Sequence, residues 1–158
     1  MSVRIAVLAS AAALLLGPPS IRVETVTNPA TSPIKDAIFI VTARHHGEVE
    51  GFSVTGRAEG LVDGKRVTRP LMLVPVPKQP GVFGVTRQWD ADRPWVLVFS
   101  IDEPDHGEHG WAEAAVRVAA GGKVLGIDYP IGKWDATPWP RRITGAEIDA
   151  ALAAMSVR

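Results

Sequence analysis

The amino-acid sequence predicts an all-β fold, an antiparallel β-sandwich of about seven strands followed by a short C-terminal α-helix. Three observations support this prediction. Several short segments alternate apolar and polar residues, which is the period of strands with one buried face. Turn sequences recur about every eight to twelve residues between residues 36 and 130, a spacing typical of sandwiches. The final residues change to a helical period.

The first strands are predicted from residue 37 onward. Residues 37–44 are apolar and β-branched, and residues 52–59 alternate strictly between apolar and polar side chains. Asp63-Gly64 then predicts a two-residue hairpin turn, because both positions tolerate a positive φ.

A return strand is expected over residues 67–76. It contains Pro70 and Pro75. Because proline has no N–H to donate to a neighbouring strand, we expect an edge or bulged strand here.

Four later segments complete the predicted sandwich, and the second is the most apolar of all. They are residues 82–89, 95–101, 111–118 and 124–129, separated by the turns around 90–94, 102–110 and 121–122. In the second, Trp95, Leu97, Phe99 and Ile101 share one face. In the third, Ala112, Ala114, Val116 and Val118 share one face, and Glu113 and Arg117 the other. Strands with at least one apolar face fit two packed sheets better than one open sheet, so an immunoglobulin-like arrangement is predicted.

The C-terminal part changes character. Residues 131–143 are rich in Trp and Pro, and we expect little regular structure there. Thr144 and Glu147 form a capping box, in which each side chain satisfies the backbone N–H of the other. Apolar residues then recur at helical spacing, which predicts an amphipathic helix over residues 144–156. They are Ile148, Ala151, Leu152 and Met155.

The N-terminus predicts export. Arg4 precedes an almost unbroken apolar run from Ile5 to Leu16. This run of about 12 residues is shorter than the roughly 20 that span a bilayer, which favours a signal sequence over a membrane-spanning helix. A buried core helix is the alternative. Residues 17–20 lack a small-x-small cleavage pattern, so the segment is either cleaved near Ser20 or retained as an anchor.

The predicted organisation therefore has five parts, and places the protein in the periplasm or outside the cell. The parts are a signal peptide or N-terminal anchor (1–20), a linker (21–35), a β-sandwich domain (36–130), a Trp/Pro-rich segment (131–143) and an amphipathic helix (144–156). A short edge strand over residues 21–26 is an alternative within the linker. Contact with a membrane is expected only if the N-terminal segment is uncleaved.

Composition excludes several classes of partner and site. The chain has 17 basic and 17 acidic residues, which argues against nucleic acid because a basic surface is its usual footprint. Cysteine is absent, so disulfides, lipoprotein attachment and thiolate metal sites are excluded, blue-copper centres among them.

Residues 36–130 resemble small exported immunoglobulin-like domains of bacteria, of the YtkA-like and copper-resistance sandwich type. The resemblance is carried by the hairpin from Gly56 to Arg66, the turn Pro80-Gly81-Val82-Phe83 and the segment Arg93-Pro94-Trp95-Val-Leu-Val. It implies the fold. Copper handling, if the resemblance extends to it, would fall to the histidines, because Met72 is the sole methionine of the β-region.

The four histidines occur in two short clusters and are the candidate metal ligands. They are His45, His46, His106 and His109, with carboxylates nearby at Asp102, Glu103, Asp105 and Glu108. If consecutive strands run up and down, both histidine loops lie at one end of the sandwich, together with the 77–81 turn. Neutral imidazole suits copper or zinc, and Asp102, Asp105 and Glu108 would support it. Two alternatives are solvated loops without a ligand and a surface patch that titrates near neutrality.

No enzyme and no cofactor are predicted. The carboxylates of the 102–108 loop are not accompanied by a cleft signal for a hydrolase. Ser53 and Ser100 lie on strands without a nucleophile-elbow motif, and Gly121-Gly122 is a hairpin turn rather than a phosphate loop.

The tryptophans have different expected roles. Trp95 and Trp111 are expected in or beside the core. Trp134 and Trp139 either pin the tail to the sandwich or form a surface for an envelope protein, and the C-terminal helix has the same two interpretations. The sequence thus predicts a non-enzymatic binding or structural module of the cell envelope with an unknown ligand. The alternative is a periplasmic copper- or zinc-binding protein that uses its histidines.

Overall fold

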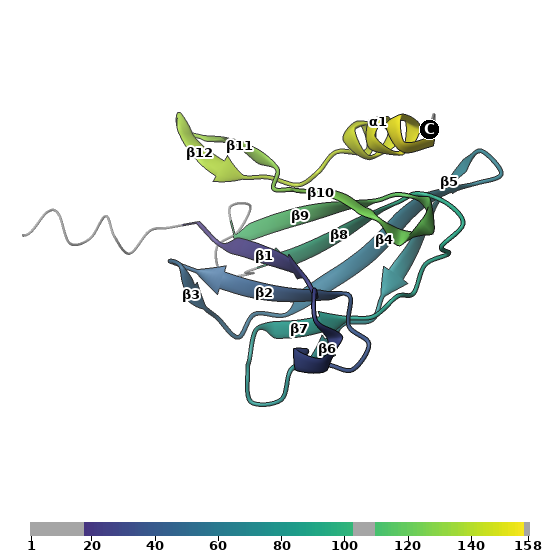
Figure 1. The fold of residues 1–158 in the computed structure, drawn as a ribbon. Coiled ribbons are helices and arrows are strands. Elements are labelled where there is room, and N and C mark those ends of the chain that lie inside the picture. The colour runs from purple at the N-terminus through teal and green to yellow at the C-terminus, as the bar shows by residue number, and fades with distance from the viewer. Residues whose placement is uncertain (1–17, 103–109, 157–158) are drawn as a thin grey trace, which may run out of the picture.

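Two antiparallel sheets packed face to face form the body of the molecule. The computed structural model describes residues 18–102 and 110–156 (Figure 1). Sheet A has the strand order β1-β2-β7-β6, with β3 also paired to β2, and sheet B has the order β10-β9-β8-β4-β5. The predicted all-β, sandwich-like fold is confirmed.

Within the described residues, ten strands form the two sheets, five in each. Sheet A consists of β1 (Ser20–Thr25), β2 (Phe39–His45), β3 (Glu48–Val49), β6 (Val74–Pro75) and β7 (Val82–Val85). Sheet B consists of β4 (Val54–Val62), β5 (Lys65–Leu71), β8 (Trp95–Asp102), β9 (Trp111–Val118) and β10 (Val124–Asp128). The tail adds β11 (Ile131–Trp134), β12 (Thr137–Pro140) and α1 (Gly145–Ser156). Short 3-10 turns lie at Pro29–Thr31 and Ala120–Gly122.

The main core lies between the two sheets and is built from the predicted alternating faces. The inner faces of β8 and β9 carry Trp95, Leu97, Phe99, Ile101, Ala112, Ala114, Val116 and Val118, each at most 2% exposed. Trp95 is fully buried, and its indole Nε1–H donates to the backbone oxygen of Asp90 at 2.9 Å. The expectation that Trp95 is a core residue is confirmed.

The predicted return strand over residues 67–76 is wrong as a single element. Its first part is β5, at one edge of sheet B, and its last part is β6, at one edge of sheet A. The chain therefore changes sheets at Met72 and Leu73. Pro70 and Pro75 both lie in edge strands, as expected for residues that cannot donate to a second neighbour.

The predicted linker over residues 21–35 is also corrected in part. Ile21 and Val23 are 5% and 4% exposed, and their strand β1 pairs with β2 along its whole length. The alternative of an edge strand is thus confirmed, and the sandwich begins at Ser20. Residues 26–35 lie outside the strands and include the 3-10 turn.

The Trp/Pro-rich segment forms a hairpin where little regular structure was expected. Strands β11 and β12 pair from Ile131↔Pro140 to Trp134↔Thr137. Asp135 and Ala136 make the turn with φ of 48° and 70°. These positive φ values are uncommon for non-glycine residues, and so the turn was not recognised from its sequence.

The C-terminal helix forms where predicted, and it is docked. In the capping box, Glu147 N–H donates to Thr144 Oγ1 at 3.2 Å and Thr144 N–H donates to Glu147 Oε2 at 2.9 Å. Ile148 and Leu152, 1% and 0% exposed, pack against the outer face of sheet B. That face is formed by Val96, Val98 and Ala115.

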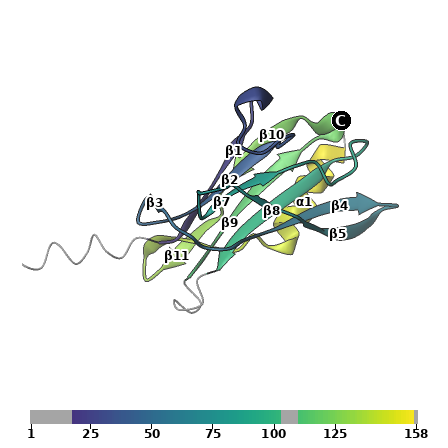
Figure 2. The same ribbon diagram turned by 90° about the horizontal axis from the view of Figure 1, so that it is seen from below.

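Sheet B is consequently covered on both faces (Figures 1 and 2). This arrangement explains why β8 is an uninterrupted apolar run rather than an alternating one. Within residues 18–102 and 110–156, no helix has the length and apolar character to cross a membrane.

Candidate functional site

The predicted histidine site is only partly within the described residues. His45 ends β2 and His46 follows it in the turn with φ of 52°, and their ring centroids are 3.9 Å apart. His106, His109, Glu103, Asp105 and Glu108 lie outside the described residues. Asp102 is the last residue of β8.

The strand ends that flank the two histidine loops lie where parity places them. β2 and β8 both end, and β9 begins, at the same end of the sandwich (Figure 1). The 77–81 turn shares this end, because the Gly81 oxygen accepts from the N–H of Ala43 near the end of β2. Of the residues described, no three His, Asp or Glu side chains converge to hold a metal ion.

A different candidate surface is formed by the tail. We define the tail surface as the outer side of sheet B together with residues 128–156, which lie over it (Figure 1). It contains three hollows that adjoin one another. Arg141 lines both the first and the second hollow, and Trp111 lines both the second and the third.

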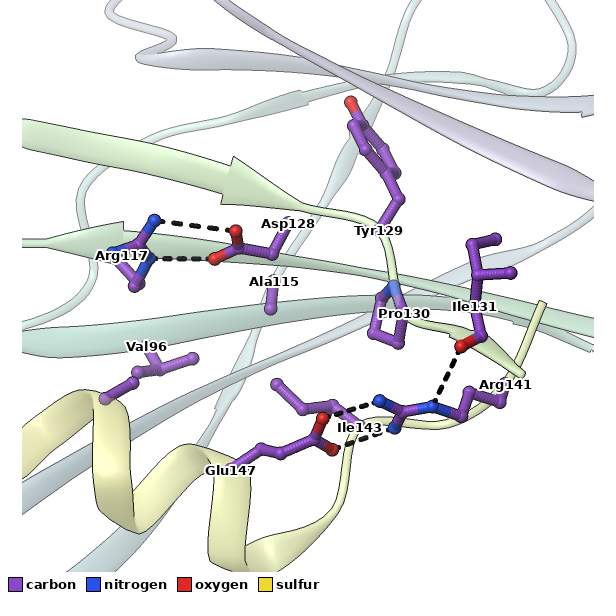
Figure 3. Close-up of a pocket in the computed structure, with 11 residues that line it drawn as sticks. Val96, Ala115, Arg117, Asp128, Tyr129, Pro130, Ile131, Arg141, Ile143 and Glu147 are labelled. Atoms are coloured by element: carbon purple, nitrogen blue, oxygen red, sulfur yellow. Dashed lines mark hydrogen bonds and ion pairs between the residues drawn. The ribbon is translucent and has the colours of Figure 1, made fainter.

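The first hollow, the helix cavity, lies between α1, sheet B and the crossing from β10 to β11. It has a volume of about 340 Å³ and is partly open to solvent (Figure 3). Val96 and Ala115 come from the sheet, Ile143 and Ala151 from the tail, and Pro130 from the crossing. Apolar side chains from three segments therefore meet in one recess.

Two arginine–carboxylate pairs border the helix cavity (Figure 3). Arg117 Nε and Nη2 donate to the two carboxylate oxygens of Asp128 at 2.8 and 3.4 Å. Arg141 donates from Nη1 to Glu147 Oε2 at 2.8 Å and from Nη2 to Oε1 at 2.5 Å. Arg141 Nε also donates to the Ile131 oxygen at 3.3 Å, which ties the hairpin to the helix start. Such two-point pairs hold both partners in one orientation.

The Arg141–Glu147 pair changes the titration of both groups. The hydrogen bonds from Arg141 lower the pKa of Glu147 well below its ordinary value, and the bonds from the Thr144 backbone and side chain add to this effect. The same pair raises the pKa of Arg141. Both groups are charged at neutral pH, so Glu147 accepts hydrogen bonds from Arg141 and Thr144 and holds the start of α1 to the hairpin.

The second hollow, the Trp cleft, has a volume of about 510 Å³ and lies beside the hairpin. It is lined by Trp111, Trp134 and Trp139, together with Gly132, Lys133, Pro140 and Arg141. The rings of Trp134 and Trp139 meet edge to face with centroids 4.6 Å apart. Trp134 is 41% exposed, so a large apolar side chain remains at the surface.

The third hollow, of about 210 Å³, is polar and contains the anchor of the tail. Glu113, 5% exposed, accepts from the backbone N–H of Ile143 at 2.7 Å and from Ser100 Oγ at 2.8 Å. Arg57 lies 3.4 Å from the same carboxylate and 3.1 Å from the buried Glu59. Buried carboxylates with this many donors fix the position of what they bind, here the segment that enters α1.

Arg142 lies at the boundary between the Trp cleft and the polar hollow. Its guanidinium carbon is 5.4 Å from the centroid of the Trp111 ring, a cation–π distance, and Nη2 is 3.8 Å from Asp102 Oδ2. Trp111 is half-buried on the outer face of sheet B, where it lines both hollows, and it belongs to neither apolar core cluster, so the expected place in or beside the core is corrected.

The sequence pointed to Trp134 and Trp139 but did not identify the helix cavity. Its residues belong to β8, β9, β10 and the tail, and nothing local to any of these segments brings them together. Comparison with protein-family models, with curated proteins and with solved structures found no match to this chain.

The lowered pKa of Glu147 should make the stability of the folded protein depend on pH. Because the pKa of Glu147 is lowered on folding, its contribution is present above the ordinary glutamate pKa of about 4.3 and is lost progressively as the pH falls below it. Glu147→Gln is expected to melt at a lower temperature than wild type at pH 7. That difference should shrink as the pH falls towards about 3. Thermal melts followed by circular dichroism at several pH values measure it, and a difference that stays constant with pH would contradict the proposed role.

Proposed function

We propose that the protein is an exported, non-enzymatic binding module of the cell envelope that holds its ligand on the tail surface. One observation carries the proposal. The docked tail encloses the helix cavity with an apolar floor and two oriented arginine–carboxylate pairs, and this cavity continues into the Trp cleft. Concave apolar sites with a few fixed polar groups are the usual form of binding sites in proteins.

The chemistry of the tail surface supports recognition. Asp128 and Glu147 are each engaged by an arginine, and Glu113 is engaged by Ser100, Arg57 and a backbone N–H. The two arginine–carboxylate pairs offer charges in fixed positions to a ligand, and the buried Glu113 fixes the segment that enters α1. The exposed tryptophan edges add large contact area at a low cost in conformational entropy.

Site-specific photo-crosslinking to envelope extract tests the proposal. A benzophenone amino acid is placed at Ile131, 52% exposed at the edge of the helix cavity, and in a matched variant at Met72, 77% exposed and away from the tail. We expect a defined adduct at position 131 that is absent at position 72. Equal labelling at the two positions, or no adduct at either, would overturn the proposal.

A second candidate function is copper or zinc binding by His45, His46, His106 and His109. It is favoured by the close imidazoles of His45 and His46 and by the shared end of β2 and β8. Isothermal titration of the full chain with Cu(II) and Zn(II) tests it. Binding tighter than about 100 μM that is lost in His106→Ala/His109→Ala supports the site, and weaker binding or no binding rejects it.

A further inference from the structure

The Trp cleft and the polar hollow adjoin at Trp111, and together they place an aromatic wall beside a polar one. Trp111, Trp134 and Trp139 line the cleft of about 510 Å³, and Trp134 is 41% exposed. The polar hollow of about 210 Å³ adds the hydroxyls of Thr55 and Ser100 to its charged side chains. A ligand that spans both must therefore present apolar faces and hydrogen-bonding groups within a short length.

The charges of this surface are balanced. Three ion pairs hold all but one of the charged side chains that are described in the two hollows, namely Arg142–Asp102, Arg57–Glu113 and Arg141–Glu147. The remaining one, Lys133, is exposed and lies two residues from the exposed acidic Asp135. A charged ligand would meet repulsion beside each attraction, so the surface suits a neutral polar molecule.

An arginine beside a carboxylate places N–H donors next to oxygen acceptors. A sugar hydroxyl both donates and accepts, so neighbouring hydroxyls of a pyranose ring match both members of such a pair. Arg142 and Asp102 are the accessible pair, with side chains that are 62% and 65% exposed. Glu113 is buried and already accepts from three donors, so it holds Arg57 in place and is not offered to the ligand.

The indole rings supply the apolar contact that the same ligand needs. The C–H groups on one face of a pyranose ring carry a small positive charge, and the face of an indole ring is negative, so the two stack favourably. The guanidinium carbon of Arg142 is 5.4 Å from the centroid of the Trp111 ring. Stacking and hydroxyl recognition are therefore available side by side.

The free edge of β12 does not suit a peptide that adds a strand. β12 contacts β9, the strand that begins at Trp111. The N–H of Arg141 donates to the Pro130 oxygen on the β11 side, and successive N–H groups of a strand point to opposite edges. The positions of β12 that face away from β11 are therefore Pro138 and Pro140, which have no N–H. An added strand would find no donor there.

A proline-rich peptide is a second ligand that aromatic-lined grooves bind. Its prolines provide carbonyl acceptors but no N–H donors. Such a peptide would satisfy Arg142 and leave the carboxylate of Asp102 without a donor from the ligand. Sugar hydroxyls satisfy both groups, which favours a sugar over this peptide.

We infer that the Trp cleft and the polar hollow bind an uncharged glycan chain. Its sugar rings stack on Trp134 and Trp111, and its hydroxyls bond to Arg142 and Asp102. This inference rests on the proposed function and names the ligand class of the Trp cleft side of the tail surface.

Titration of the full chain with neutral tetrasaccharides tests the inference. The probes are maltotetraose, cellotetraose and tetra-N-acetylchitotetraose, and decaproline is the peptide probe. Isothermal titration measures the Kd, and saturation-transfer difference NMR identifies the ligand protons that contact the protein. We expect at least one tetrasaccharide to bind with a Kd below about 1 mM. Its affinity should change less than about twofold between about 50 and 500 mM NaCl, because salt screens charges and the ligand has none.

Two substitutions separate the aromatic contact from the polar one. Trp134→Ala should weaken binding about fivefold or more, and Trp134→Phe, which keeps a ring, should recover part of that loss. Arg142→Met keeps an apolar stem beside Trp111 but removes the donors, and it should weaken binding several-fold. Met72→Ala is the control, because Met72 is 77% exposed and lies away from the tail, and it should leave binding unchanged. Circular dichroism checks that each variant is folded.

Three outcomes overturn the inference. They are a Kd above about 1 mM for all three tetrasaccharides, binding that Trp134→Ala and Arg142→Met both leave unchanged, and decaproline binding that is tighter than that of every tetrasaccharide. If the tetrasaccharides fail but the residue 131 crosslinker yields a defined protein adduct from envelope extract, the partner is a protein and the proposed function stands. If a tetrasaccharide binds as expected but no adduct forms from the extract, the glycan site stands and the envelope function falls.

Discussion

Replacing Gly60 with alanine is expected to destabilise the protein by about 3 kcal/mol. Gly60 of β4 lies opposite Trp95 of β8, and a Cβ added at residue 60 would meet Cε3 and Cζ3 of the indole at 2.6 and 2.7 Å. The ring is fully buried and its Nε1–H is bonded to the Asp90 oxygen, so it has little freedom to move away. Urea unfolding followed by tryptophan fluorescence measures the loss.

A matched substitution separates packing from the general effect of removing a glycine. In Gly51→Ala the nearest atom to the new Cβ is the Cβ of Pro80 at 3.6 Å, an ordinary contact, so a change within about 0.5 kcal/mol is expected. Trp95→Phe makes room beside residue 60. The double variant Gly60→Ala/Trp95→Phe should therefore lose less than the sum of the two single losses. A Gly60→Ala variant as stable as wild type would show that the indole does not lie over this glycine.

Leu152→Ala is expected to cost about 2 to 4 kcal/mol. Leu152 is 0% exposed and packs with Ile148 against Val96 and Val98 of β8. Its removal leaves a cavity between the helix and the sheet. It also loosens α1 next to the helix cavity, so both the unfolding free energy and any ligand binding at that cavity should fall.

Met155→Ala provides the graded comparison, because Met155 belongs to the same apolar stripe but is only half-buried. We expect it to lose clearly less stability than Leu152→Ala. Hydrogen exchange of α1 is the second measurement, since amide protection in the helix should decrease in Leu152→Ala before protection in β8 does. Equal and small effects of both substitutions would mean that α1 is not docked in solution.

Local patterns in the sequence were sufficient for most individual elements. The period-2 alternation located β4 and β9, and an apolar run located β8. Asp63-Gly64 located the turn between β4 and β5, and Thr144 with Glu147 located the start of α1. Each of these signals depends on residues within a few positions of one another. Parity of strand direction then placed the ends of β2 and β8 at one end of the sandwich, again without knowledge of packing.

The errors occurred where a decision was not local. Residues 67–76 satisfy the pattern of one strand, but the chain leaves sheet B after Leu71 and joins sheet A at Val74. This change of sheet depends on the pairing partners β4 and β7, which are distant in the sequence. The Trp/Pro-rich segment pairs as a hairpin although its turn, Asp135-Ala136, carries neither glycine nor asparagine. Asp-Ala is not one of the residue pairs that commonly form a two-residue hairpin turn. The hairpin forms nevertheless, because β12 pairs with β11 and the tryptophans of the hairpin lie beside Trp111.

The sequence by itself determined the fold class, the apolar inner faces of the sandwich, the capped helix and the grouping of the histidines. Only the tertiary structure decided which surface of the molecule is a candidate site. Val96 and Val98 show in the sequence as apolar residues of a strand, but their burial depends on a helix some 50 residues later in the chain. Burial of apolar area is not directional and acts between any segments that meet, so a sequence pattern shows that a face must be covered without showing what covers it.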